Sequence, residues 1–327
     1  MRVTDSVLEF LELNRGQYVS GGEIAEELGV SRNAVWKAVN ALREKGYNIG
    51  AVTNKGYILY ENNDIVSSQS VGKYIKHSGI RVEYRDIVTS TNTVLKEMAE
   101  NGEREGLLLV ASEQTAGKGR RGRSFSSQKG TGIYFSLLLR PDMKPSDSLL
   151  ITTCAATSVA KAIEANTDRK TAIKWVNDIY LDDKKVCGIL TEAAFDLEGG
   201  RLAYAVLGIG INICFSEDSL PEELRGIAGA VFEQQNWGGD IVSKIVADTV
   251  NFFMEEYRCL TRKNFIEDYR KRSLLDGKNI DVIKPDRTES AVALGIDDDF
   301  RLHVRYDDGK EEFLSSGEVS TKVNHMR

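Results

Sequence analysis

The sequence has few of the residues that build covalent or metal-held frameworks. It contains four cysteines and three histidines in 327 residues, and both types are scattered along the chain. No Cys-x-x-Cys pair occurs among Cys154, Cys187, Cys214 and Cys259. Dispersed cysteines of this kind are typical of free, buried thiols in a reducing compartment, rather than of disulfides or metal ligands. We therefore expect a cytoplasmic protein without a disulfide framework or a His-based metal site.

Long apolar runs and an excess of positive charge are also absent. No stretch approaches the roughly 20 apolar residues of a membrane span. Residues 1–16 place acids inside their apolar pattern and have no cleavage-site signature, so we expect neither a membrane partner nor a signal peptide. The formal net charge is -6, which argues against a general polyanion-binding protein. Any contact with nucleic acid must therefore come from a local basic patch.

The residues that are present fall into three segments with different patterns. Residues 1–62 have helical patterns followed by two short β-like pieces. Residues 63–275 alternate helical and strand patterns with hairpin turns at 182–185 and 198–200, which predicts an α+β domain with a mixed sheet. Residues 276–327 show only short strand patterns separated by turns, which predicts a small antiparallel, SH3-like β-barrel. We expect a multidomain α/β protein with these boundaries.

The central segment predicts several individual elements. Helical periodicity marks four helices and apolar runs mark five strands. The expected helices are 90–102, 149–167, 240–260 and 262–273, and the expected strands are 106–114, 131–141, 172–181, 185–195 and 201–213.

The first segment follows the plan of a winged helix-turn-helix. Apolar spacing predicts a helix over 6–13, and a short helix over 23–28 would be capped by Ser20 or Gly21 and ended by Gly29. A further helix would begin after Ser31, and residues 47–52 and 56–60 would form a β wing.

The third predicted helix begins with residues that suit a DNA major groove. Between residues 31 and 45, four bases outweigh one acid, which leaves a net charge of +3. Polar and basic residues at the start of such a helix reach base edges and phosphates. The candidates are Ser31, Arg32, Asn33, Trp36 and Lys37. The alternative is a small dimerisation module with a solvated basic face.

Residues 117–132, with the sequence GKGRRGRSFSSQKGTG, differ from the rest of the chain because they carry five cations and no acid. Their glycines match the spacing of the dinucleotide fingerprint, but no helical pattern follows, and no Walker lysine motif occurs. Glycines let a backbone approach a ligand closely, and arginines offer forked donors to phosphate oxygens. The segment therefore predicts a phosphate-binding loop, for a nucleotide or an acyl phosphate rather than for DNA.

Other polar residues of the central segment could complete such a site. Lys185 stands among apolar neighbours, and a buried lysine must pair with an anion. Asn177 and Asp178 offer oxygens that suit Mg²⁺, although Asp178 and Lys174 could instead form an ordinary ion pair at a strand end. Residues 89–93 open a predicted helix, where they could be a simple cap or could hold a polar ligand.

Taken together, these motifs resemble those of the biotin–protein ligases, in the bacterial form that also represses the biotin operon. The resemblance covers nearly the whole chain. Besides the winged helix, it rests on STN at 90–92, EQTAGKGRRGR at 113–123, KWVND at 174–178, KKVCGIL at 184–190, GIGIN at 208–212, GID at 295–297 and SGEVS at 316–320. The sequence departs from the family pattern at Lys118, where arginine is usual, and at Val176, where proline is usual.

The resemblance implies a two-step, ATP-dependent ligase. Biotin would react with ATP, in the presence of Mg²⁺, to give biotinyl-5′-AMP, and the biotinyl group would then pass to a lysine of a biotin carboxyl carrier domain. It also implies a repressor of biotin biosynthesis and transport genes that binds operator DNA with biotinyl-AMP as corepressor, as a homodimer that the adenylate promotes. Two alternatives stay open: a biotin-sensing transcription factor without ligase activity, and a lipoate-type acyl-protein ligase.

The resemblance also implies roles for single residues. Lys185 and Arg120 would be catalytic, and Asp178 would bind Mg²⁺. The residues expected around biotin are Ser90, Thr91, Asn92, Gln114, Gly117, Lys118, Gly119, Arg120, Lys185 and Gly188. Those expected around the adenylate or ATP are Arg121, Arg123, Phe125, Lys174, Asn177, Asp178 and Asn212.

Overall fold

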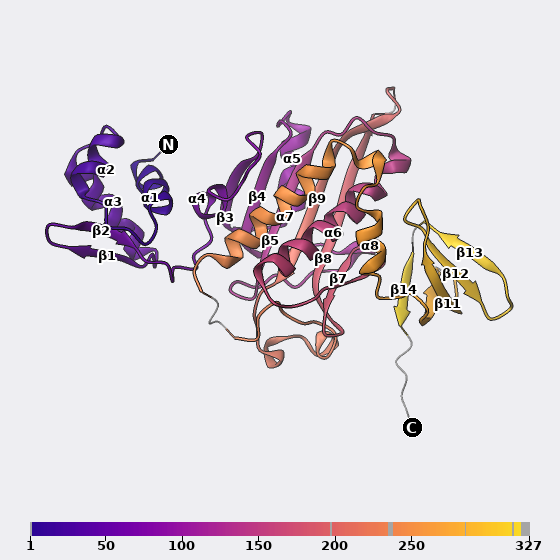
Figure 1. The fold of residues 1–327 in the computed structure, drawn as a ribbon. Coiled ribbons are helices and arrows are strands. Elements are labelled where there is room, and N and C mark those ends of the chain that lie inside the picture. Colours follow the sequence, from indigo (N-terminus) through magenta and orange to yellow (C-terminus); the bar gives the residue numbers. More distant parts are fainter. Residues whose placement is uncertain (1, 197, 235–237, 285, 316, 322–327) are drawn as a thin grey trace.

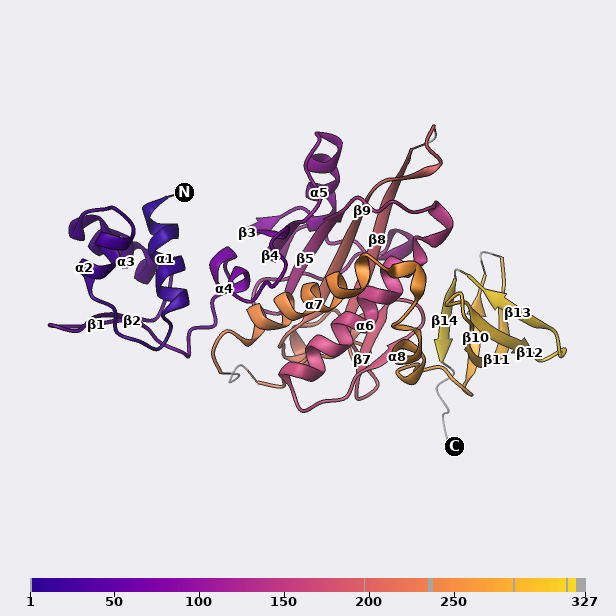
Figure 2. The ribbon, with the colours of Figure 1, turned by 45° about the horizontal axis from the view of Figure 1, so that its top comes forward.

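The computed structural model describes residues 2–196, 198–234, 238–284, 286–315 and 317–321 (Figure 1). They form a helical unit with a hairpin, a large central domain and a C-terminal sheet, which follow one another in space as they do in sequence (Figures 1 and 2). Residues 322–327 and Ser316, which the predicted C-terminal domain includes, lie outside the described residues. Among the described residues, no helix is both long enough and apolar enough to cross a membrane.

The N-terminal unit is a winged helix-turn-helix, as predicted. Helices α1 (Val3–Leu13), α2 (Gly21–Glu27) and α3 (Arg32–Glu44) enclose a small apolar core, and β1 (Ile49–Val52) pairs with β2 (Gly56–Leu59) as an antiparallel wing. The side chain of Ser20 accepts a hydrogen bond from the backbone nitrogen of Glu23, and that of Ser31 from the nitrogen of Ala34. These bonds satisfy backbone donors that a helix start leaves open, which confirms both predicted caps.

The central domain is built on a mixed sheet. Within the described residues seven strands follow the order β3-β4-β5-β9-β8-β7-β6, in which β3 runs parallel to β4 and all other neighbours are antiparallel. The strands are β3 (Arg81–Val88), β4 (Leu107–Gln114), β5 (Gly132–Leu139), β6 (Ala172–Lys174), β7 (Asp178–Leu181), β8 (Lys184–Asp196) and β9 (Arg201–Asn212). The predicted turns at 182–185 and 198–200 join β7 to β8 and β8 to β9.

Helices cover both faces of this sheet. The side chains of Leu108 and Val110 pack with α6 (Leu149–Asn166) and α7 (Ile241–Tyr257) on one face. Their neighbours Leu107 and Leu109 pack with α5 (Thr91–Glu100) on the other face, as the alternation of side chains along a strand requires. The short helices α4 (Ser68–Gly72) and α8 (Ile266–Lys271) lie toward the N-terminal and C-terminal units, respectively (Figure 1).

Three sequence predictions for this domain need correction. The expected strand 172–181 is two strands, β6 and β7, joined at residues 175–177 into a hairpin. The expected helix 262–273 is helical only as α8, after a short 3-10 turn at Leu260–Arg262. Helix α4 and strand β3 were not predicted from the sequence.

The C-terminal unit is an antiparallel sheet, as predicted. It contains β10 (Asn279–Ile283), β11 (Thr288–Ile296), β12 (Leu302–Tyr306), β13 (Glu311–Leu314) and β14 (Glu318–Thr321). In the described part of the unit the strand pairs run in an open order from β13 through β12, β11 and β10 to β14.

The cysteines are free, and Cys154, Cys187 and Cys214 are buried, as predicted, whereas Cys259 is partly exposed. Burial raises the pKa of the Cys187 thiol, so this neighbour of the Lys185 segment stays protonated and unreactive.

Candidate active site

A cavity of about 630 Å³ lies over the central sheet, and its lining draws on parts of the chain that are distant in sequence. Apart from Gly117, every ligand-binding residue that the sequence suggested in the central domain lines it. Gly117 supports the lining, since its carbonyl accepts a hydrogen bond from the backbone nitrogen of Phe125 at 2.9 Å. The structure thus brings the separate motifs together in one place.

Two glycines let side chains rest directly on the sheet below the cavity. A Cβ atom at Gly208 would lie 2.1 Å from Asn92 Oδ1, and one at Gly210 would lie 2.6 Å from Cε1 of Phe125. Both distances are far shorter than a carbon contact allows, so the packing of Asn92 and of the Phe125 ring requires glycine at these positions.

The start of α5 is held by side chains of the sheet. Ser90 stands at the cap position, but its side chain makes no capping hydrogen bond. Instead, Gln114 Oε1 accepts hydrogen bonds from the backbone nitrogen and the Oγ1 of Thr91, at 2.8 and 3.2 Å. Ser136 Oγ lies 2.7 Å from both Thr91 Oγ1 and Asn92 Oδ1. The helix start is therefore held as part of the cavity wall rather than closed by a simple serine cap.

A charged pair lies behind this wall. Glu192 accepts hydrogen bonds at 2.9 Å from Lys96 Nζ and from Asn92 Nδ2. Burial alone would raise the pKa of Glu192, but the bonds from Lys96 and Asn92 and the charge of Lys118 together lower it. An ionised Glu192 therefore fixes the orientation of the Asn92 amide.

The basic loop folds back on itself instead of opening a helix. The nitrogen of Gly119 donates to the carbonyl of Arg123 at 2.7 Å, and residues 120–122 form a single 3-10 turn. Arg120 Nη1 donates to Asn177 Oδ1 at 3.0 Å, and Nη2 donates to the carbonyl of Gly317 at 3.4 Å. The loop thus contacts both the KWVND segment and the C-terminal unit.

Lys185 has the anionic partner that the sequence required. Its Nζ lies 2.7 Å from Asp178 Oδ1, and the two side chains are 30% and 22% exposed, so both are only partly buried and face the cavity. The backbone of Lys185 pairs with the 227–229 segment, through bonds of 2.8 Å to Ile227 and from Gly229. Asn212 Nδ2 donates to the carbonyl of Gly229 at 2.9 Å, which fixes this segment as a further wall.

Helix α8 and the C-terminal unit together hold the turn that carries Asn177. Trp175 Nε1 donates to the carbonyl of Phe300 at 2.9 Å, and the hydroxyl of Tyr269 donates to the carbonyl of Val176 at 3.2 Å. Asn177 Nδ2 donates to the carbonyl of Ile189 at 2.8 Å. The position of Asn177 in the cavity therefore depends on packing outside the central sheet.

Comparison with known proteins agrees with this geometry. Residues 84–212 match the biotin/lipoate A/B protein ligase family, residues 4–58 match an HTH domain, and residues 277–322 match the biotin protein ligase C-terminal domain. The chain is 34% identical over 317 residues to the bifunctional ligase/repressor BirA of Bacillus spizizenii. These aligned residues make up 95% of this chain and 96% of that protein. The BirA of Bacillus subtilis is 33% identical over the same shares.

The chain belongs to the family of bifunctional biotin ligases and repressors. A solved structure agrees: the biotin protein ligase of Aquifex aeolicus in complex with biotin and ATP is 26% identical, with a TM-score of 0.59 over 73% of this chain and 97% of that one.

As a member of this family, the chain is an ATP-dependent biotin–protein ligase joined to a DNA-binding repressor module, and biotin and ATP are its substrates. Similarity to ligase/repressors along almost the full length favours this function over a lipoate-type ligase and over a sensor without ligase activity.

The residues predicted to contact DNA share one surface of this ligase/repressor. Arg32, Asn33, Trp36 and Lys37 are all exposed on α3, and Trp36 is 54% exposed. The opposite side of α3, with Val35, Ala38, Val39 and Leu42, is buried in the core. Ser31 is also exposed and serves as the cap.

Several residues of the ligase cavity were missed by the sequence analysis. Gly317 and Val319 come from the C-terminal unit, and Phe215, Leu224 and Ile227 belong to the irregular segment that follows β9. The SGEVS motif contains Gly317 and Val319 but gave no sign that they reach this cavity, and the other three residues belong to no local pattern. Ser136, behind the wall, did leave a signal, because it is the one polar residue in the apolar strand IYFSLLL.

Proposed function

We propose that the cavity performs both half-reactions of biotin transfer. In the first, an oxygen of the biotin carboxylate attacks the α-phosphorus of ATP, the bond to the β-phosphate oxygen breaks, and pyrophosphate leaves. In the second, the Nζ of a carrier-domain lysine attacks the acyl carbon of biotinyl-5′-AMP, AMP leaves, and the lysine loses a proton. The observation that carries this proposal is the ion pair of Lys185 with Asp178 in a cavity that the basic loop also lines.

The charge of the cavity suits an adenylate. Among the described residues that line it, six are bases and two are acids, Asp178 and Glu223. A chain with a formal charge of -6 thus places its cations around one site. Negative charge that accumulates between the carboxylate and the α-phosphate would be stabilised there without acid–base chemistry.

Lys185 would be the catalytic cation. Its ammonium group lies at the cavity surface, and its backbone is fixed on both sides, to Ile227 and Gly229. An incoming carboxylate and α-phosphate would replace part of its interaction with Asp178 and bring two anions to the same donor. Arg120, which is fixed by Asn177 and Gly317, would cover the adenylate from the loop side and help to exclude water from a hydrolysable mixed anhydride.

Biotin would bind in the part of the cavity beside the start of α5. Hydroxyl and amide groups there could both donate hydrogen bonds to the ureido ring and accept them from it. They belong to Ser90, Thr91, Asn92 and Gln114, and Lys118, Gly119 and Gly188 also line the cavity. Arg121, Arg123, Phe125, Lys174, Asn177 and Asn212 would surround the nucleotide, with the Phe125 ring as an apolar surface for a base or ring.

Mg²⁺ would enter with ATP. In the described parts of the chain, no group of three or more His, Cys, Asp or Glu side chains could hold a metal alone. Nucleotide-bound Mg²⁺ needs only one or two carboxylates besides phosphate oxygens and water, and Asp178 supplies one such carboxylate. When bound, the ion would neutralise charge on the phosphates.

The repressor function would depend on the same adenylate. A single winged helix contacts one half-site and offers few phosphate contacts, whereas two linked modules gain effective concentration on a palindrome. Biotinyl-AMP would order the basic loop and promote a homodimer through the central domain, and the carrier domain would compete for that surface.

Four free cysteines and the use of ATP support a cytoplasmic location.

The test is mass spectrometry of a purified biotin carboxyl carrier domain after incubation with the protein, Mg²⁺, ATP and either biotin or lipoate. We expect a single biotinylated lysine and no lipoylation. Lipoylation of the carrier domain would show that the protein is a lipoate-type ligase. An unmodified carrier domain together with measurable biotin binding would show that it is a biotin sensor without ligase activity.

A further inference from the structure

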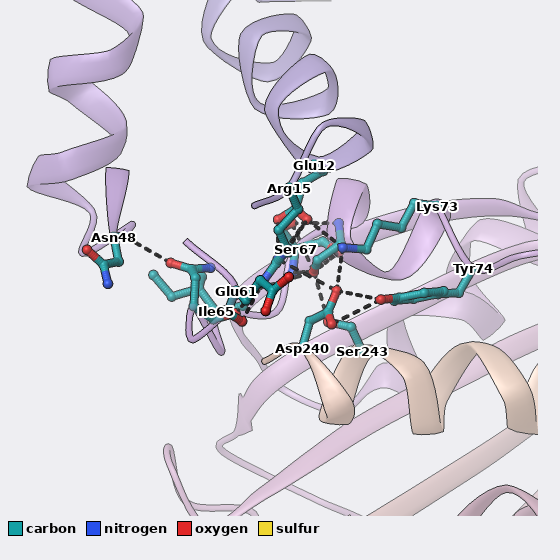
Figure 3. Close-up of polar contacts among 12 residues, drawn as sticks. Glu12, Arg15, Asn48, Glu61, Ile65, Ser67, Lys73, Tyr74, Asp240 and Ser243 are labelled. Carbon is teal, nitrogen blue, oxygen red and sulfur yellow. Dashed lines mark hydrogen bonds and ion pairs between the residues drawn. The ribbon is translucent and has the colours of Figure 1, made fainter. Parts of the chain in front are cut away.

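Four charged side chains meet where the winged helix adjoins the ligase domain (Figure 3). We call this group the joint; it consists of Glu12 and Arg15 from the winged helix and Lys73 and Asp240 from the ligase domain. Lys73 Nζ lies 2.8 Å from Glu12 Oε2 and also forms an ion pair with Asp240. Arg15 Nη2 lies 2.7 Å from Glu12 Oε2 and 3.6 Å from Asp240 Oδ2. Ion pairs therefore cross the boundary in both directions.

The joint is almost fully buried. The side chain of Glu12 is 1% exposed, those of Arg15 and Lys73 are 10% exposed, and that of Asp240 is 12% exposed. Burial alone would raise the pKa of Asp240, but the hydrogen bond from Lys73 and the charge of Arg15 lower it, so the carboxylate is ionised. Each domain contributes one acid and one base, so a rotation of either domain would separate opposite charges inside a poorly solvated contact.

Such an arrangement fixes the relative orientation of the two domains more than it adds to the stability of the protein. Desolvation offsets most of the attraction within a buried ion pair, so its net contribution to stability is small. A buried charge that loses its partner is costly, and misaligned orientations of the winged helix are therefore penalised.

The ligase half of the joint is built on a packed corner of two helices. Asp240 directly precedes α7, and the hydroxyl of Tyr74 donates one shared hydrogen bond to its carboxylate, with both oxygens 3.0 Å away. Lys73 directly follows α4, and Ser70 Oγ of α4 lies 2.9 Å from Ser243 Oγ of α7. The charges of this half are thus fixed with respect to the sheet.

The connection between the domains is tied to the same place. Arg15 Nη1 donates to the carbonyl of Asn63 at 2.7 Å, and Asn63 Oδ1 accepts a hydrogen bond from the backbone nitrogen of Asn48 at 3.0 Å. Ile65 packs against the apolar core of the winged helix. The connection is therefore held along its length, and the winged helix can turn only if the joint opens.

We propose that Lys73 and Asp240, two residues of the ligase domain, are positioning residues for operator recognition. By fixing the orientation of each winged helix, they set the separation of the two reading helices in the dimer. Half-sites that lie one helical turn, about 34–36 Å, or a multiple of it apart are bound together only if that separation is maintained. This inference rests on the dimeric operator complex proposed above.

The experiment compares full-length wild type with Asp240→Asn and Lys73→Met. A third variant, Glu12→Gln with Lys73→Met, removes one acid and one base together, so the joint keeps zero net charge if a single change destabilises the fold. Lys284→Met removes the same charge from an ion pair of the C-terminal sheet with Glu289 and serves as the matched control.

The DNA probe is a duplex that the wild-type protein, with biotin and ATP, selects from a random-sequence library. Affinity is measured for this duplex, for one isolated half-site, and for the duplex with about half a helical turn, roughly five base pairs, inserted between the half-sites. Pyrophosphate release is measured alongside.

We expect the wild type and Lys284→Met to prefer the full duplex to the half-site by about 100-fold or more and to lose this preference on insertion. The joint variants should keep half-site affinity and pyrophosphate release, bind the full duplex at least about tenfold more weakly, and tolerate the insertion better.

Two results would overturn the inference: an unchanged spacing profile in all joint variants, or an equal loss of affinity for half-site and full duplex, which is the mark of a purely structural role. A wild type without any preference for two half-sites would instead refute the dimeric repressor, and the joint inference with it.

Discussion

Replacing Tyr269 with phenylalanine should weaken ATP use without changing the shape of the core. Tyr269 is 1% exposed, and its hydroxyl donates to the carbonyl of Val176 at 3.2 Å. Phenylalanine fills the same space, but the Val176 carbonyl loses its partner, which costs about 1–3 kcal/mol of the free energy of unfolding. The next residue, Asn177, contacts Arg120 and lines the cavity. If about 1 kcal/mol of that loss weakens the binding of ATP through Asn177, the KM for ATP rises roughly fivefold.

The assay is steady-state pyrophosphate release with ATP and biotin varied in turn, together with thermal unfolding. Tyr257→Phe is the matched control, because its hydroxyl donates at 2.6 Å to Glu105 and Tyr257 does not line the cavity, as far as the chain is described. We expect Tyr269→Phe to raise the KM for ATP more than the KM for biotin, and the control to change neither. A lower melting temperature with an unchanged KM for ATP would refute the link between the packing of α8 and the nucleotide site.

Three further predictions concern the loop, the winged helix and acid stability. Arg120→Gly should fold normally but release biotinyl-AMP, so that bystander lysines become biotinylated; labelling confined to the carrier domain would argue against a covering loop. A chain lacking residues 1–62 should still ligate biotin, because Lys73 and Asp240 can pair with each other once the winged helix is gone. It should lose operator binding, and retained operator affinity would contradict this. The pKa of Glu192 is lowered in the folded state from its ordinary value of 4.5, so its contribution to stability is present above that value and is lost as the pH falls through the lower folded-state pKa. Glu192→Gln should therefore destabilise the protein at neutral pH and much less in acid, well below the ordinary pKa of 4.5, in urea unfolding; an equal difference at both pH values would disprove the assignment.

Local patterns predicted much of this fold. The caps at Ser20 and Ser31, the turns of the β7–β8 and β8–β9 hairpins, and the helical periodicity of α5, α6 and α7 each depend on neighbouring residues, and the structure confirms them. The cationic loop was visible because its charge differs in sign from that of the whole chain.

Features that depend on distant contacts were not predictable. Strand β3 is an edge strand in which polar and apolar residues alternate only from Arg81 to Arg85, because Asp86 stands where the next apolar residue would be. The hairpin turn at 175–177 has no glycine or proline, and contacts with Tyr269 and Phe300 hold it.

The same limit applies to the joint and to the site. Glu12 and Arg15 look like solvated charges of an amphipathic helix until Lys73 and Asp240 are brought beside them. Gly317 joins the cavity from the last strand region of the chain. The residue roles in the site rest on resemblance and geometry together, and they stay proposals.

The most direct test of the central claim is the formation of biotinyl-5′-AMP by Lys185→Ala. The measurement is release of pyrophosphate from ATP in the presence of biotin and Mg²⁺, with biotin binding followed separately by calorimetry. Removing a preorganised donor to developing charge lowers a rate by about 100- to 1,000-fold, so we predict a loss of this size in Lys185→Ala, with biotin still bound. Pyrophosphate release at the wild-type rate in Lys185→Ala would contradict the account.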